Sequence, residues 1–206
     1  TRIMNRQFEP SELVTATDGT PYHIRIRPEA LADNVILVGD PARVDLIAGK
    51  LDKVGDKTSN REIVSCKGED KGKPITILST GMGVGCIDIV VNELDICANV
   101  DLEKREPKPV HRSLNIIRIG TCGSLQDDLE VGTHVASAYA IGIDGLAYYY
   151  KGLEKINDEK LIEQFLKQTS WDKKLPYPYA VKADNELLNR IASDTHKGIT
   201  ITAPGF

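Results

Sequence analysis

The chain has 206 residues, of which 41% are hydrophobic and 27% are charged, so it is long enough to bury a full hydrophobic core. Its formal net charge of −4 argues against nucleic acid as the main partner, because proteins that bind the phosphate backbone usually carry a basic excess. No apolar stretch approaches the roughly 20 residues of a membrane helix, and the first residues lack the apolar core of a signal peptide. The four cysteines show neither CxxC pairs nor the density of a disulfide framework. We therefore expect one cytoplasmic domain over residues 1–206, with reduced thiols and no membrane partner.

The first predicted strand, residues 35–38, leads through a turn into a helix. Gly39 ends the strand, Asp40 is a good N-cap, and Pro41 suits the first helical position. Apolar residues then recur at helical spacing, which predicts a buried stripe made of Val44, Leu46, Ile47 and Leu51. Two apolar strands, 62–66 and 74–78, flank the polar segment GEDKGK and predict a β-hairpin, with Arg61 and Glu62 opening its first strand.

The rest of the chain continues to alternate strands and helices. A glycine-rich loop precedes a helix over residues 87–98, and a charged surface connector over 101–111 leads to an apolar strand ending at residue 119. That strand is apolar on both faces, as in a central strand of a parallel sheet. A long apolar stretch over 131–143, helices over 158–168 and 183–193, and a strand over 197–202 follow. This alternation predicts an α/β fold with a parallel or mixed sheet.

The segment LNIIRIGTCGS, residues 114–124, places one arginine, Arg118, inside an apolar strand and follows it with small and hydroxyl residues. In open α/β sheets, ligands bind beyond the carboxyl ends of the strands, where Arg118 is expected to emerge. Backbone amides and hydroxyls there can hold a phosphate, and the residues that supply them are Gly120, Thr121, Gly123 and Ser124. A buried salt bridge between Arg118 and a carboxylate is an equally good interpretation of this segment alone.

The turn GDPAR, residues 39–43, is a second candidate anion site. Gly39 allows close backbone approach, and Arg43 lies in the first helical turn, where the helix dipole favours negative charge. If Asp40 caps the helix, a phosphate must rely on the Gly39 amide and the Arg43 side chain. The alternative is a capped helix with a solvated arginine.

The loop TGMGVGC, residues 80–86, lies between a strand and a helix, as a dinucleotide-binding fingerprint requires, and Asp101 lies about twenty residues beyond its start. Cys86, however, occupies the position of the third glycine. A tight turn that lets the helix pack close to the sheet is therefore the favoured interpretation. The histidines form no cluster with the spacing of a metal site or a catalytic triad.

Five motifs, taken in order, resemble the nucleoside phosphorylase family, and most closely its uridine-cleaving members: GDPAR, NRE, STGMG, RIGTCGS and IDGLAYYY. The resemblance runs from about His23 to the last residue. It implies a three-layer α/β fold with a central mixed sheet flanked by helices. It also implies a pentosyltransferase that uses inorganic phosphate to cleave a nucleoside, uridine in the first place, into ribose 1-phosphate and free base.

The resemblance also implies roles for particular residues. The phosphate would be held by Gly39, Arg43, Arg61, Arg118 and Thr121, of which Arg118 and Thr121 are expected to be catalytic. The nucleoside would be contacted by His23, Thr121, Cys122, Gly123 and Phe206. Because Arg61 and His23 would act from a neighbouring subunit, we expect a homo-oligomer, either a dimer or a trimer of dimers. No cofactor is expected besides phosphate as co-substrate.

Two departures from the family pattern shape these expectations. Family members can hold a monovalent cation between subunits by a glutamate, a backbone carbonyl and a serine, at positions that correspond to Glu62, Met82 and Cys86. A thiol here replaces a serine and is a poor ligand for potassium, so we expect little cation binding. The family also continues past Phe206 into segments that contact the base and the ribose. We therefore expect these 206 residues to carry the phosphate half of the site and to be nearly inactive alone.

Four other functions fit parts of the pattern. A purine nucleoside phosphorylase fits the same motifs. A nucleosidase would hydrolyse the same bond with water but has no use for the arginines. A dinucleotide-binding oxidoreductase would use the glycine loop, and a non-catalytic subunit would bind phosphate or nucleoside without turnover.

Overall fold

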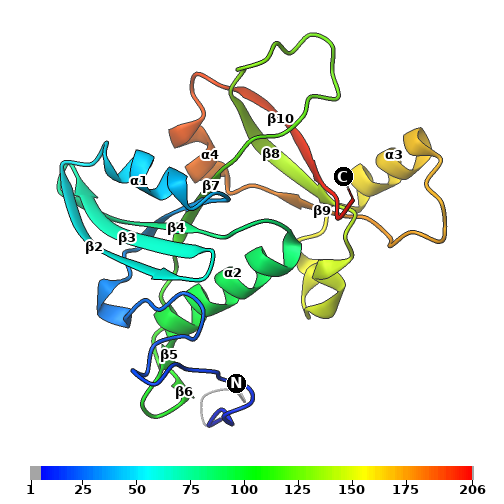
Figure 1. Cartoon of the computed structure of the whole chain (residues 1–206). Helices are drawn as coiled ribbons and strands as arrows, with labels where there is room; N and C mark the ends of the chain where they lie inside the picture. The colour runs from blue at the N-terminus through cyan, green and yellow to red at the C-terminus, as the bar shows by residue number, and fades with distance from the viewer. Residues whose placement is uncertain (1–5, 206) are drawn as a thin grey trace. The chain divides into compact units, whose positions relative to one another are not determined.

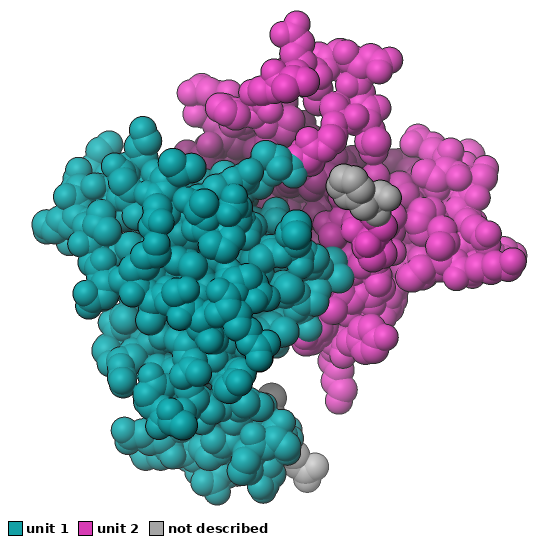
Figure 2. All heavy atoms as spheres, viewed as in Figure 1, with its two compact units in different colours: residues 1–121 teal, residues 122–206 magenta. Residues whose placement is uncertain are grey.

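The structure, a computed structural model, describes residues 6–205 and falls into two compact units, Thr1–Thr121 and Cys122–Phe206 (Figures 1 and 2). Each unit combines helices with a mixed sheet, which confirms the predicted α/β class. The expectation of a single domain stays a prediction. Among the described residues, no helix is long and apolar enough to cross a membrane.

The first unit is built on a five-stranded mixed sheet with the strand order β2-β3-β4-β1-β7 (Figure 1). The strands are β1 (Asn34–Val38), β2 (Lys53–Asn60), β3 (Ile63–Asp70), β4 (Lys73–Ser79) and β7 (Asn115–Ile119). Strand β1 pairs in parallel with both β4 and β7, whereas β2, β3 and β4 form antiparallel hairpins. The carboxyl ends of β4, β1 and β7 therefore meet at one edge of the sheet.

Two helices cover opposite faces of this sheet, α1 (Ala42–Ala48) and α2 (Val84–Asn99) (Figure 1). Successive side chains of β1 point to opposite faces. Val35 and Leu37 accordingly pack in one cluster with Leu94 of α2, and Val38 packs in another with Val44 of α1. The first unit thus has the three layers that the family resemblance implied.

The predicted apolar stripe of α1 is wrong at one position. Val44 is buried, but Leu46 is 69% exposed. At 3.6 residues per turn, position 46 lies about 200° around the helix from position 44, so the two side chains cannot share a face. The helix begins at Ala42, whose amide donates to the Asp40 carboxylate at 2.9 Å, so Asp40 satisfies an amide at the helix start as predicted.

The two hairpins of the five-stranded sheet turn over two residues each. Lys71 and Gly72, both with positive φ (48° and 74°), join β3 to β4, which confirms the predicted hairpin and is typical of a type I′ turn. Arg61 and Glu62 join β2 to β3, so the prediction that they open a strand is wrong: they form the tip, and Arg61 has a φ of 55°. The sequence did not predict β2 because seven of its eight residues are exposed and no apolar alternation marks it.

The prediction that residues 114–119 form a buried central strand is also wrong. Among the described residues, β7 pairs only with β1 and is the last strand of its sheet. Arg118 is exposed and Ile119 is 47% exposed, whereas Leu114 and Ile116 pack against the α2 cluster. Apolar residues on both faces predicted that both faces are covered. Within the first unit, only the face toward α2 is covered.

The predicted surface connector contains a two-stranded hairpin, β5 (Val100–Asp101) and β6 (Glu106–Pro107). Arg105, just before β6, donates to the carbonyls of Phe8, Glu9 and Leu13 and so fixes the N-terminal segment. Further along, Ile24 and Ile26 are buried in the α2 cluster, before the short helix η1 (Pro28–Ala30). The N-terminal segment is therefore part of the core of the first unit.

The second unit has a three-stranded sheet with the order β10-β8-β9. Its strands are β8 (Val135–Gly142), β9 (Tyr179–Lys182) and β10 (His196–Thr202), and its helices are η2 (Leu146–Tyr149), η3 (Leu153–Lys155), α3 (Glu159–Thr169) and α4 (Asn185–Ile191). Ile162 of α3 packs on Ile141 and Ala180 of the sheet, and Asp158 and Asp184 cap the two α-helices. The sequence predicted both α-helices and β10, marked the region of β8 only as a long apolar stretch, and did not predict the four-residue β9.

Leu94 tests the packing of α2 against the sheet, because it is fully buried. Leu94→Ala removes buried methyl groups and leaves a cavity, so we expect the free energy of unfolding to fall by about 2–5 kcal/mol. Leu46→Ala is the matched control and should change it by less than about 0.5 kcal/mol. Urea unfolding followed by circular dichroism measures both, and equal destabilisation would contradict the assigned faces.

Candidate active site

Three loops meet at the carboxyl edge of the parallel strands of the first unit. They begin with Gly39 after β1, Thr80 after β4 and Gly120 after β7. The Thr80 amide donates to the Val38 carbonyl at 2.8 Å, and the Gly81 amide donates to the Gly39 carbonyl at 3.0 Å. Ligands bind at this edge in open α/β sheets, and here it carries glycine-bearing loops that hydrogen bonds hold together.

The Arg118 guanidinium lies across two of these loops. A Cβ on Gly39 would lie 3.6 Å from Nη2 of Arg118, and one on Gly120 would lie 2.6 Å from Nη1. The glycine at position 120 therefore makes room for the side chain. Among residues 6–205, Arg118 makes no side-chain hydrogen bond and no ion pair, so the structure does not support the buried salt bridge that the sequence left open. The guanidinium is exposed and available to an anion.

Arg43 and Gly39 share the turn that leads into α1. The Arg43 side chain is half-buried and has no ion pair within the described part of the chain. Asp40 accepts from the Ala42 amide at the helix start, and α1 has only seven residues, so the helix terminus itself offers little to an anion. That a phosphate here would rely on the Arg43 side chain and on the Gly39 amide stays a prediction.

The glycine loop after β4 is shaped by the tip of the β2–β3 hairpin. A Cβ on Gly81 would lie 2.9 Å from Cγ of Glu62, and Ser79 Oγ donates to the Glu62 carbonyl at 2.8 Å. Gly81 and Gly83 both have positive φ (70° and 91°), which favours glycine. Packing and turn geometry thus account for these glycines, which supports the tight-turn interpretation over a dinucleotide site. The side chain of Arg61, at the same tip, is exposed.

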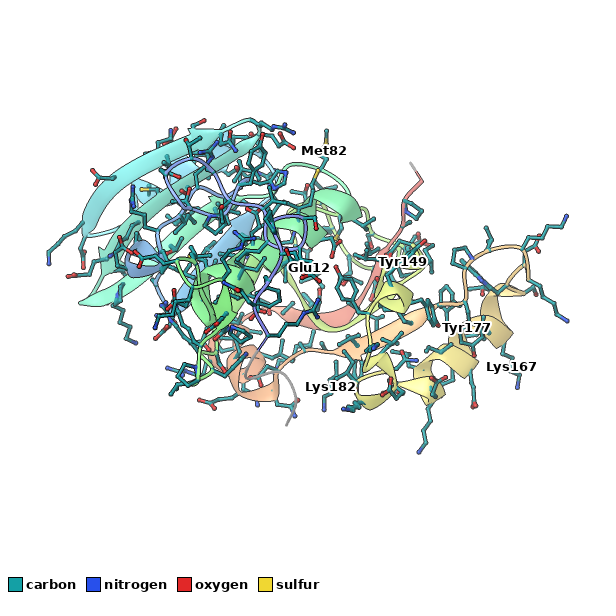
Figure 3. The ribbon with its side chains drawn as sticks, turned by 90° about the horizontal axis from the view of Figure 1, so that it is seen from below. Glu12, Met82, Tyr149, Lys167, Tyr177 and Lys182 are labelled. Carbon is teal, nitrogen blue, oxygen red and sulfur yellow. The ribbon has the colours of Figure 1, made fainter. Side chains whose placement is uncertain are left out.

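The candidate cation residues fit a potassium ion poorly. Cys86 Sγ lies 3.9 Å from Oε1 of Glu62, so the structure brings these two together. Met82 is 90% exposed and projects from the loop before α2 (Figure 3). With a thiol in place of a hydroxyl, the Glu62 carboxylate and the backbone carbonyl of Met82 are the hard donors left, which is a weak set for potassium. Among the described residues, no group of three His, Cys, Asp or Glu side chains could hold a metal ion.

His23 is held by Glu93, a residue that the sequence analysis missed. The Nδ1 atom of His23 lies 2.6 Å from Oε1 of Glu93, and Glu93 is buried on α2. The sequence does contain a signal: Glu93 is the one charged residue on the face of α2 that also carries Val90, Leu94 and Cys97. The His23 side chain keeps 28% of its surface exposed, so a ligand can reach its free edge.

Three residues expected to contact a nucleoside lie outside the first unit. Cys122 and Gly123 open the second unit and are both exposed. Phe206 lies outside the described residues. The roles of all three stay predictions.

The motif IDGLAYYY lies in the second unit and lines a pocket of about 450 Å³. Tyr149 and Tyr177, labelled in Figure 3, both contribute to its wall. Asp144 accepts from Tyr179 Oη at 2.9 Å, and burial together with this hydrogen bond raises the pKa of Tyr179. Asp144 therefore holds the turn of the motif in place.

Comparison with known proteins places the chain in a family. Residues 33–206 match the phosphorylase superfamily. The chain belongs to that superfamily. It is 29% identical to the uridine phosphorylase of Thermococcus kodakarensis over 151 residues, which are 73% of this chain and 50% of the relative. It is 36% identical to a DeoD-type purine nucleoside phosphorylase of Bacillus thuringiensis over 110 residues, 53% of this chain and 41% of that one.

Solved phosphorylase structures share the fold. A Trypanosoma brucei nucleoside phosphorylase described as showing uridine phosphorylase activity superposes with a TM-score of 0.74 at 27% identity, covering 94% of this chain and 69% of that one. These findings confirm the resemblance on which the phosphorylase site was predicted. The chain spans about half the length of the curated relatives it matches.

The four thiols of this phosphorylase chain should differ sharply in reactivity. Burial raises the pKa of Cys97 to about 12 and also raises that of Cys66, whereas Cys122 is exposed. The thiolate is the reacting form, so at pH 8 a thiol with a pKa of 12 is about 0.01% ionised. We expect a colorimetric disulfide reagent to modify Cys122 first, Cys86 more slowly, and the two buried thiols only after unfolding.

Mass spectrometry of the modified peptides identifies the order. Cys122→Ser should remove the fast phase and leave the rest unchanged. Modification of Cys97 as fast as Cys122 in the folded protein would contradict its burial.

Proposed function

We propose that the protein containing this chain cleaves the N-glycosidic bond of a nucleoside with inorganic phosphate, and that uridine is its preferred substrate. The observation that carries the proposal is the exposed Arg118 guanidinium, which lies across Gly39 and Gly120 at the carboxyl edge of the parallel strands without a carboxylate partner among the described residues. The uridine phosphorylases among the relatives support the choice of base. The products would be ribose 1-phosphate and free base.

The chemistry needs a phosphate dianion that is stripped of water and aimed at C1′ of the ribose. As the bond from C1′ to the base nitrogen breaks, its electrons leave with the base, which takes up a proton, and C1′ becomes cation-like. A phosphate oxygen then forms the new bond to C1′. Arg118 and Arg43 would supply the charge that binds and orients the dianion, with the Gly39 amide and the Thr121 hydroxyl as further donors. No covalent enzyme intermediate is required.

The proposal includes a homo-oligomer, either a dimer or a trimer of dimers. Arg61, at the exposed tip of the β2–β3 hairpin, would reach the phosphate of a neighbouring subunit. His23 would contact the ribose 5′-hydroxyl there, through the edge of its ring that does not face Glu93.

A purine nucleoside phosphorylase is the second candidate, because DeoD-type relatives match 53% of the chain at 36% identity. A base-release assay with uridine, inosine and adenosine separates the two. Fastest release of uracil supports the first candidate, whereas fastest release of hypoxanthine or adenine supports the second.

Arg118 tests the phosphorolytic reaction. Removing one preorganised cationic donor costs about 100- to 1,000-fold in rate at comparable sites, so we expect Arg118→Ala to lower kcat/KM for uridine by that factor. Arg190→Ala, an exposed arginine on α4, is the matched control and should retain full activity. The measurement is uracil release with and without phosphate.

Activity that persists without phosphate and survives Arg118→Ala would indicate hydrolysis by water instead. Phosphate binding by calorimetry, with no release of any base, would indicate a non-catalytic binding subunit.

Substitution of Cys86 tests the expectation that this protein binds little potassium. We expect the wild-type protein to be indifferent to exchange of potassium for choline, because its thiol is a soft donor. Cys86→Ser restores a hard oxygen beside Glu62 and should make activity or thermal stability rise with potassium. Cys86→Ala, which removes the thiol without adding a hard oxygen beside Glu62, controls for thiol loss. Strong potassium dependence of the wild type would refute the expectation.

A further inference from the structure

Glu93 receives hydrogen bonds from one short stretch of the N-terminal segment. Its Oε2 accepts from the backbone amides of His23 and Ile24, each at 2.8 Å, and its Oε1 lies 2.6 Å from Nδ1 of the His23 ring. Glu93 is only 7% exposed, so these bonds form away from bulk water. One buried carboxylate therefore fixes both the backbone and the ring of His23.

The hydrogen bonds also decide where the ring proton lies. Both carboxylate oxygens face N–H donors, and an ionised carboxylate can only accept. The hydrogen bond at 2.6 Å thus requires a proton on Nδ1 of His23. In the neutral ring, Nε2 then keeps its lone pair and acts as an acceptor.

Other contacts hold the same segment from its opposite side. Asn60, at the end of β2, donates from Nδ2 to the carbonyls of Tyr22 and His23 at 3.1 Å and 2.9 Å. The Tyr22 ring lies edge-on to the His23 ring, with centroids 5.0 Å apart. The side chain of Ile24 is buried in the core. The imidazole is therefore held in one orientation as well as one tautomer.

We infer that Glu93 is a positioning residue that sets His23 as a hydrogen-bond acceptor, and that this selects nucleosides over nucleoside 5′-phosphates. The inference rests on the proposed function, in which His23 meets the ribose 5′ position. A 5′-hydroxyl can donate to Nε2. A 5′-phosphate ester is anionic, has no proton to donate at neutral pH, and meets the lone pair of Nε2 with the charge of Glu93 behind it.

Glu93→Gln is the informative variant because it keeps the shape of the side chain. The Ile24 amide bonds only Oε2, and the His23 amide lies closer to Oε2 (2.8 Å) than to Oε1 (3.1 Å), so we expect the Gln oxygen to take the place of Oε2 and the Gln nitrogen to face Nδ1 of His23. That nitrogen donates, and the ring proton has to move to Nε2. The variant therefore reverses the hydrogen-bonding role of Nε2.

The tautomer can be measured on the 206-residue chain without any activity. Long-range ¹⁵N correlation spectra at alkaline pH, where imidazole is uncharged, distinguish protonated from unprotonated ring nitrogens. We expect a proton on Nδ1 in the wild type and on Nε2 in Glu93→Gln. Asp95→Asn, an exposed carboxylate on the same helix, should match the wild type. A proton on Nε2 in the wild type would overturn the inference.

Kinetics of the complete gene product test selectivity. In Glu93→Gln we expect kcat/KM for uridine to change little, because the 5′-hydroxyl can accept from Nε2–H as well as donate to Nε2, and 5′-deoxyuridine, which lacks the hydroxyl, should also be unaffected. Inhibition by uridine 5′-monophosphate should strengthen about 3- to 10-fold, the usual worth of one hydrogen bond. In a His23→Ala background, Glu93→Gln should change none of these values.

An equal loss for uridine and 5′-deoxyuridine would show that Glu93 only stabilises the fold, and unchanged inhibition by the monophosphate would remove the claim of selectivity. If the wild-type protein releases no base from any nucleoside, the proposed function fails, and the tautomer measurement still tests whether Glu93 sets the ring. Thermal unfolding of each variant confirms that it is folded.

Discussion

Parallel pairing of β1 with both β4 and β7 is the constraint on which the rest of the first unit depends. It brings three chain segments, separated by tens of residues in sequence, to one edge of the sheet, where each strand ends in a loop. Such strands need cover on their faces, which α1 and α2 provide around β1. The residues that begin these loops then have to be small, because the Gly81 carbonyl lies close to Gly39, and side chains lie close to the backbone at Gly81 and Gly120.

The sequence predicted the elements whose signals are local. Strand β1, helix α2 and the β3–β4 hairpin each have an apolar period or turn residues of their own. Strand β2 has neither, since it owes its place to pairing with β3 and not to burial. Strand β7 was wrongly predicted to be central for the opposite reason. Its apolar residues lie on both faces, which predicts cover on both, but the first unit covers only one face. Both errors therefore arise because the sequence of one strand does not say which elements pair with it or cover it.

The candidate site likewise contains residues with a local sequence signal and one residue whose role depends on the fold. The sequence singled out Arg118 and Arg43 because each is a charge within a few residues of a glycine at the end of an apolar run, a pattern that is local. Glu93 lies 70 residues from His23, and its carboxylate became meaningful only when the fold placed α2 under the N-terminal segment. Its sole local signal is a charge among apolar positions of one helix face, which indicates a buried partner without naming it.

Arg118 and His23 differ in whether they have a carboxylate partner, and the difference matches the ligand group that each is proposed to bind. Arg118 has no ion pair among the described residues, and because it is exposed to water its charge stays available to an approaching dianion. His23, by contrast, is bound to a buried carboxylate. The group that His23 is proposed to meet is a neutral hydroxyl, so the carboxylate matters for which ring nitrogen carries the proton. The unpaired guanidinium and the paired imidazole thus suit two different ligand groups, a phosphate dianion and a neutral hydroxyl.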